Sequence, residues 1–126
     1  MSVAYVDTSC LVAIAFGERG ATAIERRLRE FDEIVSANLL EAELRCAFKR
    51  ESVEFATETL SGVSWLIPDR PLTSEIARVL DVGYVRGADC WHIASALFLE
   101  PEPSSVTFLT LDEMQRKIAK ELGFAV

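Results

Sequence analysis

The chain has 126 residues, half of them hydrophobic, and its 20 acidic and 13 basic residues give a formal net charge of −7. This length suits a single domain, 1–126, whose core is large enough to fold without disulfide bonds. The three cysteines are scattered, which argues against a disulfide framework or a structural zinc site. We expect a cytoplasmic protein, because the sequence has the pattern of neither a signal peptide nor a membrane-spanning segment.

The first half of the chain alternates short apolar segments with helical patterns. The expected elements are a strand at 3–6, helices at 10–16 and 21–31, a strand at 33–36 and a helix at 38–49. Thr8 or Ser9 is expected to cap the first helix, because both hydroxyls precede an apolar run.

The second half repeats this alternation. The expected elements are a helix at 53–60, a strand at 64–67, helices at 73–82 and 88–99, a proline-containing loop at 100–105, a strand at 106–109, a short helix ending before Gly123 and a candidate edge strand at 124–126. Strands without a polar face that alternate with helices predict an α/β fold, with a parallel sheet of four to five strands covered on both sides.

Four acidic residues fall where such a fold gathers functional groups. Asp7 and Asp112 lie at or just after the ends of predicted strands, and parallel sheets place their sites beyond these ends. Glu43 and Asp89 lie in the early turns of largely apolar helices. Carboxylates brought together repel one another, and a divalent cation such as Mg²⁺ or Mn²⁺ resolves that conflict. Taken singly, each acid could instead be a helix cap or a solvated helix residue.

The segments around these acids resemble the four motifs of the PIN-domain family, and especially those of the VapC-type toxins of toxin–antitoxin pairs. The resembling segments, in order, are 6–9, 36–45, 86–94 and 108–112. In the second motif the acid precedes a leucine, which favours Glu43 over Glu41.

This resemblance implies a PIN-like three-layer α/β/α sandwich and Mg²⁺- or Mn²⁺-dependent endonuclease action on RNA. It assigns metal binding and catalysis to Asp7, Glu43, Asp89 and Asp112, with Asp112 the least uniform of the four in its role. It also implies a homodimer and a cognate antitoxin whose C-terminal segment blocks the site. A catalytically silent PIN fold that binds RNA or protein is the alternative.

Other functions fail at named residues. A phospho-receiver domain needs adjacent acids after its first strand, where Asp7 stands alone, and a haloacid-dehalogenase phosphatase needs an aspartate where Ser9 stands. A zinc or iron site on Asp89 and His92 is conceivable, but His92 is the only histidine, and we expect it to be buried and hydrogen-bonded.

The acidic net charge argues against nucleic-acid binding in general, so an RNA site needs local basic residues. The candidates for phosphate contact are Arg45, Lys49, Arg50, Arg86, Arg116 and Lys117. Cys10, Cys46 and Cys90 are expected to be small core residues.

Overall fold

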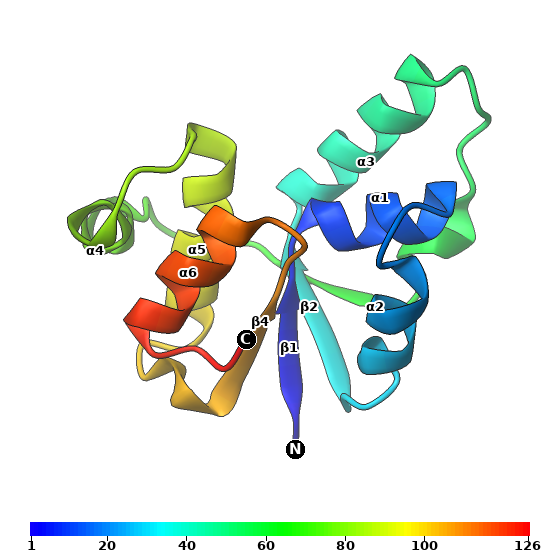
Figure 1. The fold of residues 1–126 in the computed structure, drawn as a ribbon. Coiled ribbons are helices and arrows are strands. Elements are labelled where there is room, and N and C mark those ends of the chain that lie inside the picture. The colour runs from blue at the N-terminus through cyan, green and yellow to red at the C-terminus, as the bar shows by residue number, and fades with distance from the viewer.

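The computed structural model describes residues 1–126 and consists of one parallel sheet flanked by helices (Figure 1). Its elements are β1 (Val3–Val6), α1 (Thr8–Phe16), α2 (Ala21–Leu28), β2 (Glu33–Ala37), α3 (Leu39–Arg50), β3 (Val63–Leu66), α4 (Thr73–Val82), α5 (Gly87–Leu99), β4 (Val106–Leu109) and α6 (Glu113–Leu122), with short 3-10 helices at Thr57–Leu60 and Pro103–Ser105. None of the helices is long and apolar enough to cross a membrane.

The sheet has four strands in the order β3-β2-β1-β4, and all of them run parallel. The central strand β1 is fully buried from Ala4 to Val6, as expected for a strand with helices over both faces. Its last residue, Val6, pairs with Leu109 at the end of β4. The residues that follow β1 and β4 therefore emerge side by side at one edge of the sheet.

Alternate residues of the strands supply two separate cores. Tyr5 and Phe108 point to the face covered by α4, α5 and α6, whereas Ala4, Val6 and Leu109 point to the face covered by α1, α2 and α3. Figure 1 shows these two groups of helices on opposite sides of the strands. The predicted α/β/α sandwich with a parallel sheet is confirmed, with four strands.

Two predicted elements are wrong. The helix expected at 53–60 is reduced to the 3-10 turn Thr57–Leu60. The chain leaves α3 through Ser52, whose φ of 56° is left-handed, and Phe55 then packs on Phe48 with ring centroids 5.0 Å apart. This packing holds the start of the segment against α3, and only the short 3-10 turn makes helical hydrogen bonds of its own.

The candidate edge strand at 124–126 is reduced to a single bridge between Ala125 and Thr107. Gly123 ends α6 in the left-handed conformation, with φ 109°, and turns the chain back toward β4. Phe108 donates its backbone N–H to Ala125 (2.8 Å), and Ala125 donates to Val106 (3.2 Å). Only this one residue is aligned with β4 before the C-terminus.

Candidate functional site

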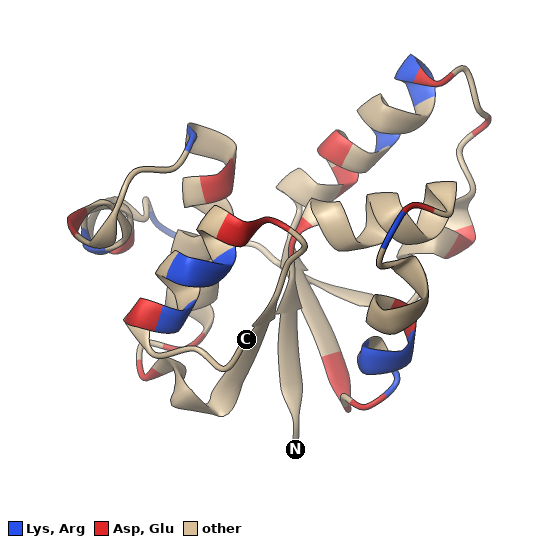
Figure 2. Cartoon of the chain, in the orientation of Figure 1, with Lys and Arg blue, Asp and Glu red and all other residues tan.

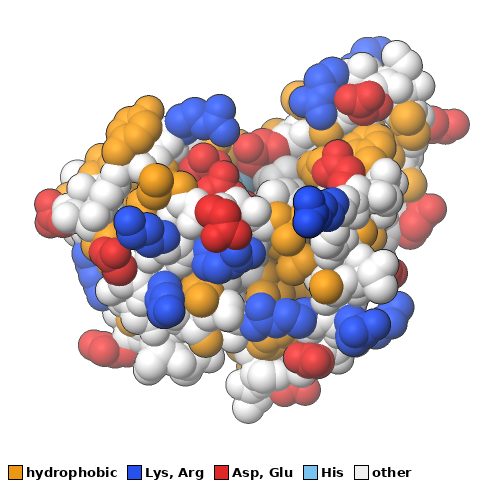
Figure 3. Space-filling view, viewed as in Figure 1, with side chains coloured by type: hydrophobic (Ala, Val, Ile, Leu, Met, Phe, Trp, Pro, Cys, Tyr) orange, Lys and Arg blue, Asp and Glu red, His pale blue; other side chains and the backbone are white.

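A hollow of about 540 Å³ opens at the carboxyl ends of the strands. It is lined by residues of α1, α3, α5 and α6 and of the loops that follow α1 and precede α5 and α6: Thr8, Ser9, Val12, Glu18, Arg19, Glu43, Ala47, Arg50, Arg86, Asp89, His92, Leu111, Asp112 and Gln115. Acidic segments of α3, α5 and α6 lie at this end of the fold (Figure 2), and acidic side chains gather in the hollow with basic ones near its rim (Figure 3). Three of the four predicted acids line it, and Asp7 is buried behind Ser9 and Gln115.

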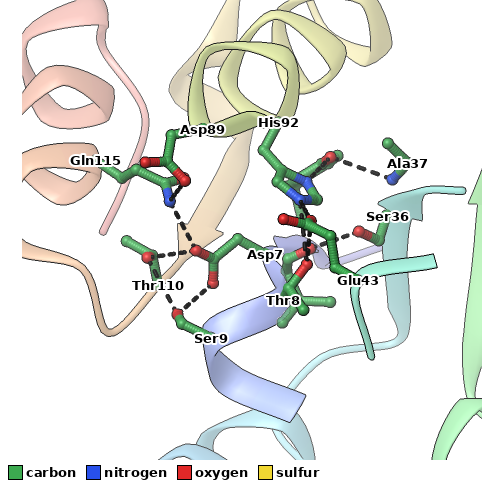
Figure 4. Close-up of polar contacts among 12 residues, drawn as sticks. Asp7, Thr8, Ser9, Ser36, Ala37, Glu43, Asp89, His92, Thr110 and Gln115 are labelled. Carbon is green, nitrogen blue, oxygen red and sulfur yellow. Dashed lines mark hydrogen bonds and ion pairs between the residues drawn. The ribbon is translucent and has the colours of Figure 1, made fainter. Parts of the chain in front are cut away.

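Asp7 lies at the junction of β1 and α1, where it is the N-cap residue of the helix. One carboxylate oxygen accepts from the Ser9 hydroxyl (2.6 Å), and the other accepts from the Thr110 hydroxyl (2.8 Å) and the Gln115 amide (2.9 Å) (Figure 4). The side chain is only 2% exposed. Burial raises the pKa of this carboxyl, and these hydrogen bonds only partly offset the effect.

Asp89 stands in the first turn of α5 and accepts from the same Gln115 amide at 3.0 Å. Burial, and next the charge of Asp112, raise the pKa of Asp89, because both disfavour a further negative charge. The guanidinium of Arg86 lies 3.8 Å away and acts in the opposite direction. Asp7 and Asp89 therefore lie on two sides of one amide group.

Asp112 is the N-cap residue of α6, and its side chain accepts the backbone N–H of Gln115 at 2.8 Å. The reading of Asp112 as a helix cap is thus confirmed. The residue also lines the hollow beside Asp89. Capping and metal binding can coexist, because the cap uses one of the two carboxylate oxygens.

Glu43 reaches the hollow from α3 and accepts from the Thr8 hydroxyl (2.6 Å) and from Nε2 of His92 (2.8 Å). Burial favours a higher pKa for Glu43, but the bonds from His92 and Thr8 outweigh burial and leave the pKa below its ordinary value. Glu41 instead pairs with Arg45 at 2.8 Å and does not line the hollow. Of these two acids, only Glu43 is brought to the site.

His92 is 1% exposed and hydrogen-bonded through both ring nitrogens, as predicted for a buried histidine. The Tyr5 hydroxyl oxygen lies 2.8 Å from Nδ1 of His92 and accepts a hydrogen bond from the backbone N–H of Ala37 (3.1 Å). The hydroxyl proton of Tyr5 can therefore be donated to Nδ1 of His92. Nε2–H then donates to Glu43. This chain fixes the ring in one tautomer and holds the Glu43 carboxylate.

The hydroxyls around Asp7 correct the capping prediction. Thr8 and Ser9 are the first two residues of α1 and cap nothing, since their hydroxyls donate to Glu43 and Asp7. Thr110 and Gln115 were missed by the sequence reasoning. Their signal was weak: Thr110 lies between β4 and Asp112, and Gln115 follows Asp112 by one helical turn.

The basic residues at the hollow differ from the predicted set. Of the six candidates only Arg50 and Arg86 line it, joined by Arg19, which was not predicted. Arg45 lies over the ring of Phe55, 4.3 Å from its centroid. Arg116 pairs with Glu113 and donates to the Thr110 carbonyl, so it is used within the fold.

The cysteine prediction holds for two residues and is wrong for the third. Cys10 and Cys90 are buried and free, and burial raises the pKa of both thiols. Cys46 is also free but exposed, because it lies on the outer side of α3. None of the three thiols lines the hollow.

The donor set at the hollow fits a hard divalent cation. Its four acids provide only oxygen ligands, which Mg²⁺ and Mn²⁺ prefer. In this conformation, no three His, Cys, Asp or Glu side chains are close enough together to form a preformed metal site. Asp7 and Asp89 are linked through the Gln115 amide, which donates to both carboxylates.

Comparison with protein families gives one match, to the PIN domain, over residues 4–121. Searches of curated proteins and of solved structures found no significant match. PIN domains are generally nucleases that bind RNA and typically use divalent metals. The match covers nearly the whole chain, and the four-stranded parallel sheet agrees with it. This chain therefore belongs to the PIN domain family.

Proposed function

We propose that this chain is a cytoplasmic, Mg²⁺- or Mn²⁺-dependent endoribonuclease, with one catalytic domain at 1–126, and that it is the toxin of a VapC-type toxin–antitoxin pair. Its metal-binding catalytic residues are Asp7, Glu43, Asp89 and Asp112. The observation that carries the proposal is the arrangement of these acids at the carboxyl edge of the sheet: Glu43, Asp89 and Asp112 line one hollow, and the buried Asp7 is linked to Asp89 through the Gln115 amide.

When bound, the divalent ion supplies an activated water and neutralises charge on the phosphodiester. The chain's own residues hold the ligands. Ser9 and Thr110 orient the Asp7 carboxylate by donating to it, and His92 and Thr8 orient that of Glu43. Arg19, Arg50 and Arg86 at the hollow are positioned to bind RNA phosphates and so draw the strand over the acids.

The proposal is tested by RNA cleavage with Mg²⁺, Mn²⁺ or a chelator, using both unpaired and folded RNAs. Glu43→Gln and Glu41→Gln form a matched pair, because both acids lie on α3 but only Glu43 lines the hollow. We expect Glu43→Gln to lower the cleavage rate by about a hundred-fold or more, since the loss of one group acting on the transition state has this magnitude. Glu41→Gln should cleave at the wild-type rate.

Equal rates for the two variants, or cleavage that survives the chelator, would refute the assignment of these acids. RNA binding without cleavage under any metal condition would favour the alternative, a catalytically silent binding module.

The toxin role rests on the resemblance of the four motifs to VapC-type proteins and is tested in cells. Expression of the wild-type chain should arrest bacterial growth, whereas Asp7→Asn should not, at matched protein levels. Co-expression of the cognate antitoxin should restore growth, and its C-terminal segment should protect Arg50 and Arg86 from chemical modification because they line the hollow. Arrest by Asp7→Asn as strong as wild type would contradict a catalytic toxin.

The homodimer is also a proposal, supported by an apolar depression beside the edge strand β3. It is lined by Asn38, Leu39, Leu66, Ile67, Pro68 and Trp91. Ile67 is 74% exposed, which is unusual for a large apolar side chain next to other apolar residues. Light scattering should give a dimer for wild type and for Val53→Glu, an exposed control, and a monomer for Ile67→Glu. A monomeric wild type would contradict it.

A further inference from the structure

Gln115, the third residue of α6, contacts three of the four proposed catalytic acids. Its side-chain nitrogen donates to Asp7 at 2.9 Å and to Asp89 at 3.0 Å, and its backbone N–H donates to Asp112 at 2.8 Å. The fourth acid, Glu43, is held separately by His92 and Thr8. No other side chain in the protein donates to two of these acids.

The side chain of Gln115 is 2% exposed, and its carbonyl oxygen Oε1 is buried without a hydrogen-bond partner. Leaving a buried acceptor unpaired is unfavourable, so a compensating interaction must hold this orientation. The two charge-assisted bonds from Nε2 provide it. The reverse orientation would set the carbonyl oxygen against two carboxylates, and the electrostatics exclude it.

The amide nitrogen thus contacts one carboxylate oxygen of the buried Asp7 and one of the half-buried Asp89. A divalent ion held by both residues would need these same oxygens. The two N–H groups of the amide carry partial positive charge and offset part of the repulsion between Asp7 and Asp89. A divalent ion bound to the same oxygens would face those hydrogens and repel them. The amide and the ion therefore exclude each other.

We infer that the Gln115 amide is an internal stand-in for the metal, holding Asp7 and Asp89 in the metal-free protein and leaving them when a divalent ion binds. The inference rests on the proposed metal site and adds a positioning residue to it. The bonds to Asp7 and Asp89 must break for the ion to enter, so Gln115 lowers the affinity for the ion. It thereby raises the metal concentration at which the site fills.

The first test follows the amide itself during a Mg²⁺ titration of the ¹⁵N-labelled full chain. The chain has one glutamine and one asparagine, so the spectrum contains two side-chain amide pairs, and Gln115→Met identifies that of Gln115. We expect the Gln115 signals to move and to saturate with the calorimetric Kd for Mg²⁺. Those of Asn38, the exposed residue that precedes α3, should stay in place.

The second test is calorimetric Mn²⁺ binding to wild type, Gln115→Met and Gln115→Asn at about pH 8, where carboxyls with ordinary pKa values are charged. Methionine keeps the length but removes the donors, and asparagine is too short to bridge both acids. We expect both variants to bind Mn²⁺ about ten-fold more tightly than wild type, because one charged hydrogen bond is worth about that factor. Two variants guard against a folding defect in either one.

Unmoved Gln115 signals in a protein that binds Mg²⁺, or variants that bind Mn²⁺ as weakly as wild type or more weakly, would overturn the inference and leave the metal site standing. Wild type that binds neither ion in calorimetry would overturn both the metal site and the inference.

Discussion

Asp7 accepts hydrogen bonds from Ser9, Thr110 and Gln115, yet its burial still raises its pKa. The folded protein therefore holds the proton of Asp7 more tightly than the unfolded chain does. Its contribution to stability is fully present below the ordinary pKa of 3.8 and is lost as the pH rises through the folded-state pKa. At neutral pH the metal-free protein keeps a charge that weakens its fold.

Asp7→Asn should consequently be more stable than wild type in the metal-free state at neutral pH. Asparagine carries no charge at any pH, so the difference in free energy of unfolding should shrink as the pH is lowered toward 3.8. Urea unfolding at a series of pH values measures this difference. A variant less stable than wild type at every pH would show that the three hydrogen bonds outweigh the charge.

His92→Asn should destabilise the fold by about 1–3 kcal/mol, because the Tyr5 hydroxyl and Glu43 each lose a partner in a buried site. Calorimetric Mn²⁺ affinity should stay within a few-fold of wild type, since both ring nitrogens of His92 are used in hydrogen bonds and Thr8 still holds the Glu43 carboxylate in the variant. Loss of metal binding with the fold intact would instead favour a site shared by Asp89 and His92.

Helix α6 carries both Asp112 and Gln115, so its position determines the geometry of this side of the site. It ends at Gly123, with φ 109°, where an added Cβ would also lie 3.3 Å from Pro103. Gly123→Ala should therefore lower the free energy of unfolding by about 1–3 kcal/mol. Gly62→Ala is the matched control, because its Cβ would meet no atom within 4 Å.

Thermal or urea unfolding of the two glycine variants measures the difference. Equal stability would show that the C-terminal end of α6 does not hold the helix in place.

At the level of elements, the sequence predicts strands well where a short, mostly apolar segment is buried on both faces of the sheet. β1 is apolar throughout and β4 is apolar except at Thr107, and both were predicted with their observed bounds. The segment 53–60 was not, because its conformation depends on Phe55 packing against Phe48, a tertiary contact. The bridge at Ala125 likewise depends on the turn at Gly123.

The same limit applies to the site. Asp7 is predicted to lie at the site because it follows a buried strand, and Glu43 because it matches a family motif. The contacts of Gln115 with Asp7 and Asp89 arise only when α5 and α6 pack together. Nor can spacing alone distinguish Arg50, which lines the hollow, from Arg45, which stacks on Phe55.

Across the whole molecule the net charge of −7 opposes RNA, and Arg19, Arg50 and Arg86 at the hollow must overcome it locally. RNA affinity should fall steeply with salt, and Arg50→Ala should reduce the slope of log K against log salt by about 0.7–0.9. Binding is measured with Asp7→Asn as the background, so that the RNA is not cut. Arg29→Ala, an exposed control at the C-terminal end of α2 that does not line the hollow, should leave the slope unchanged.

If the slope of log K against log salt for Arg50→Ala equalled that of wild type, Arg50 would not contact the RNA phosphates, which would then bind elsewhere on the surface.

The central claim is that the four acids form one divalent-cation site, and thermal unfolding under a Mn²⁺ titration tests it without knowledge of the RNA. A ligand that binds only the folded state at ten times its Kd adds about 1.4 kcal/mol, which raises the Tm of a domain of this size by roughly 3–6 °C. We predict this rise for wild type and for Glu41→Gln, and none for Asp89→Asn. A wild-type Tm that stays flat up to about 10 mM Mn²⁺ would contradict the account.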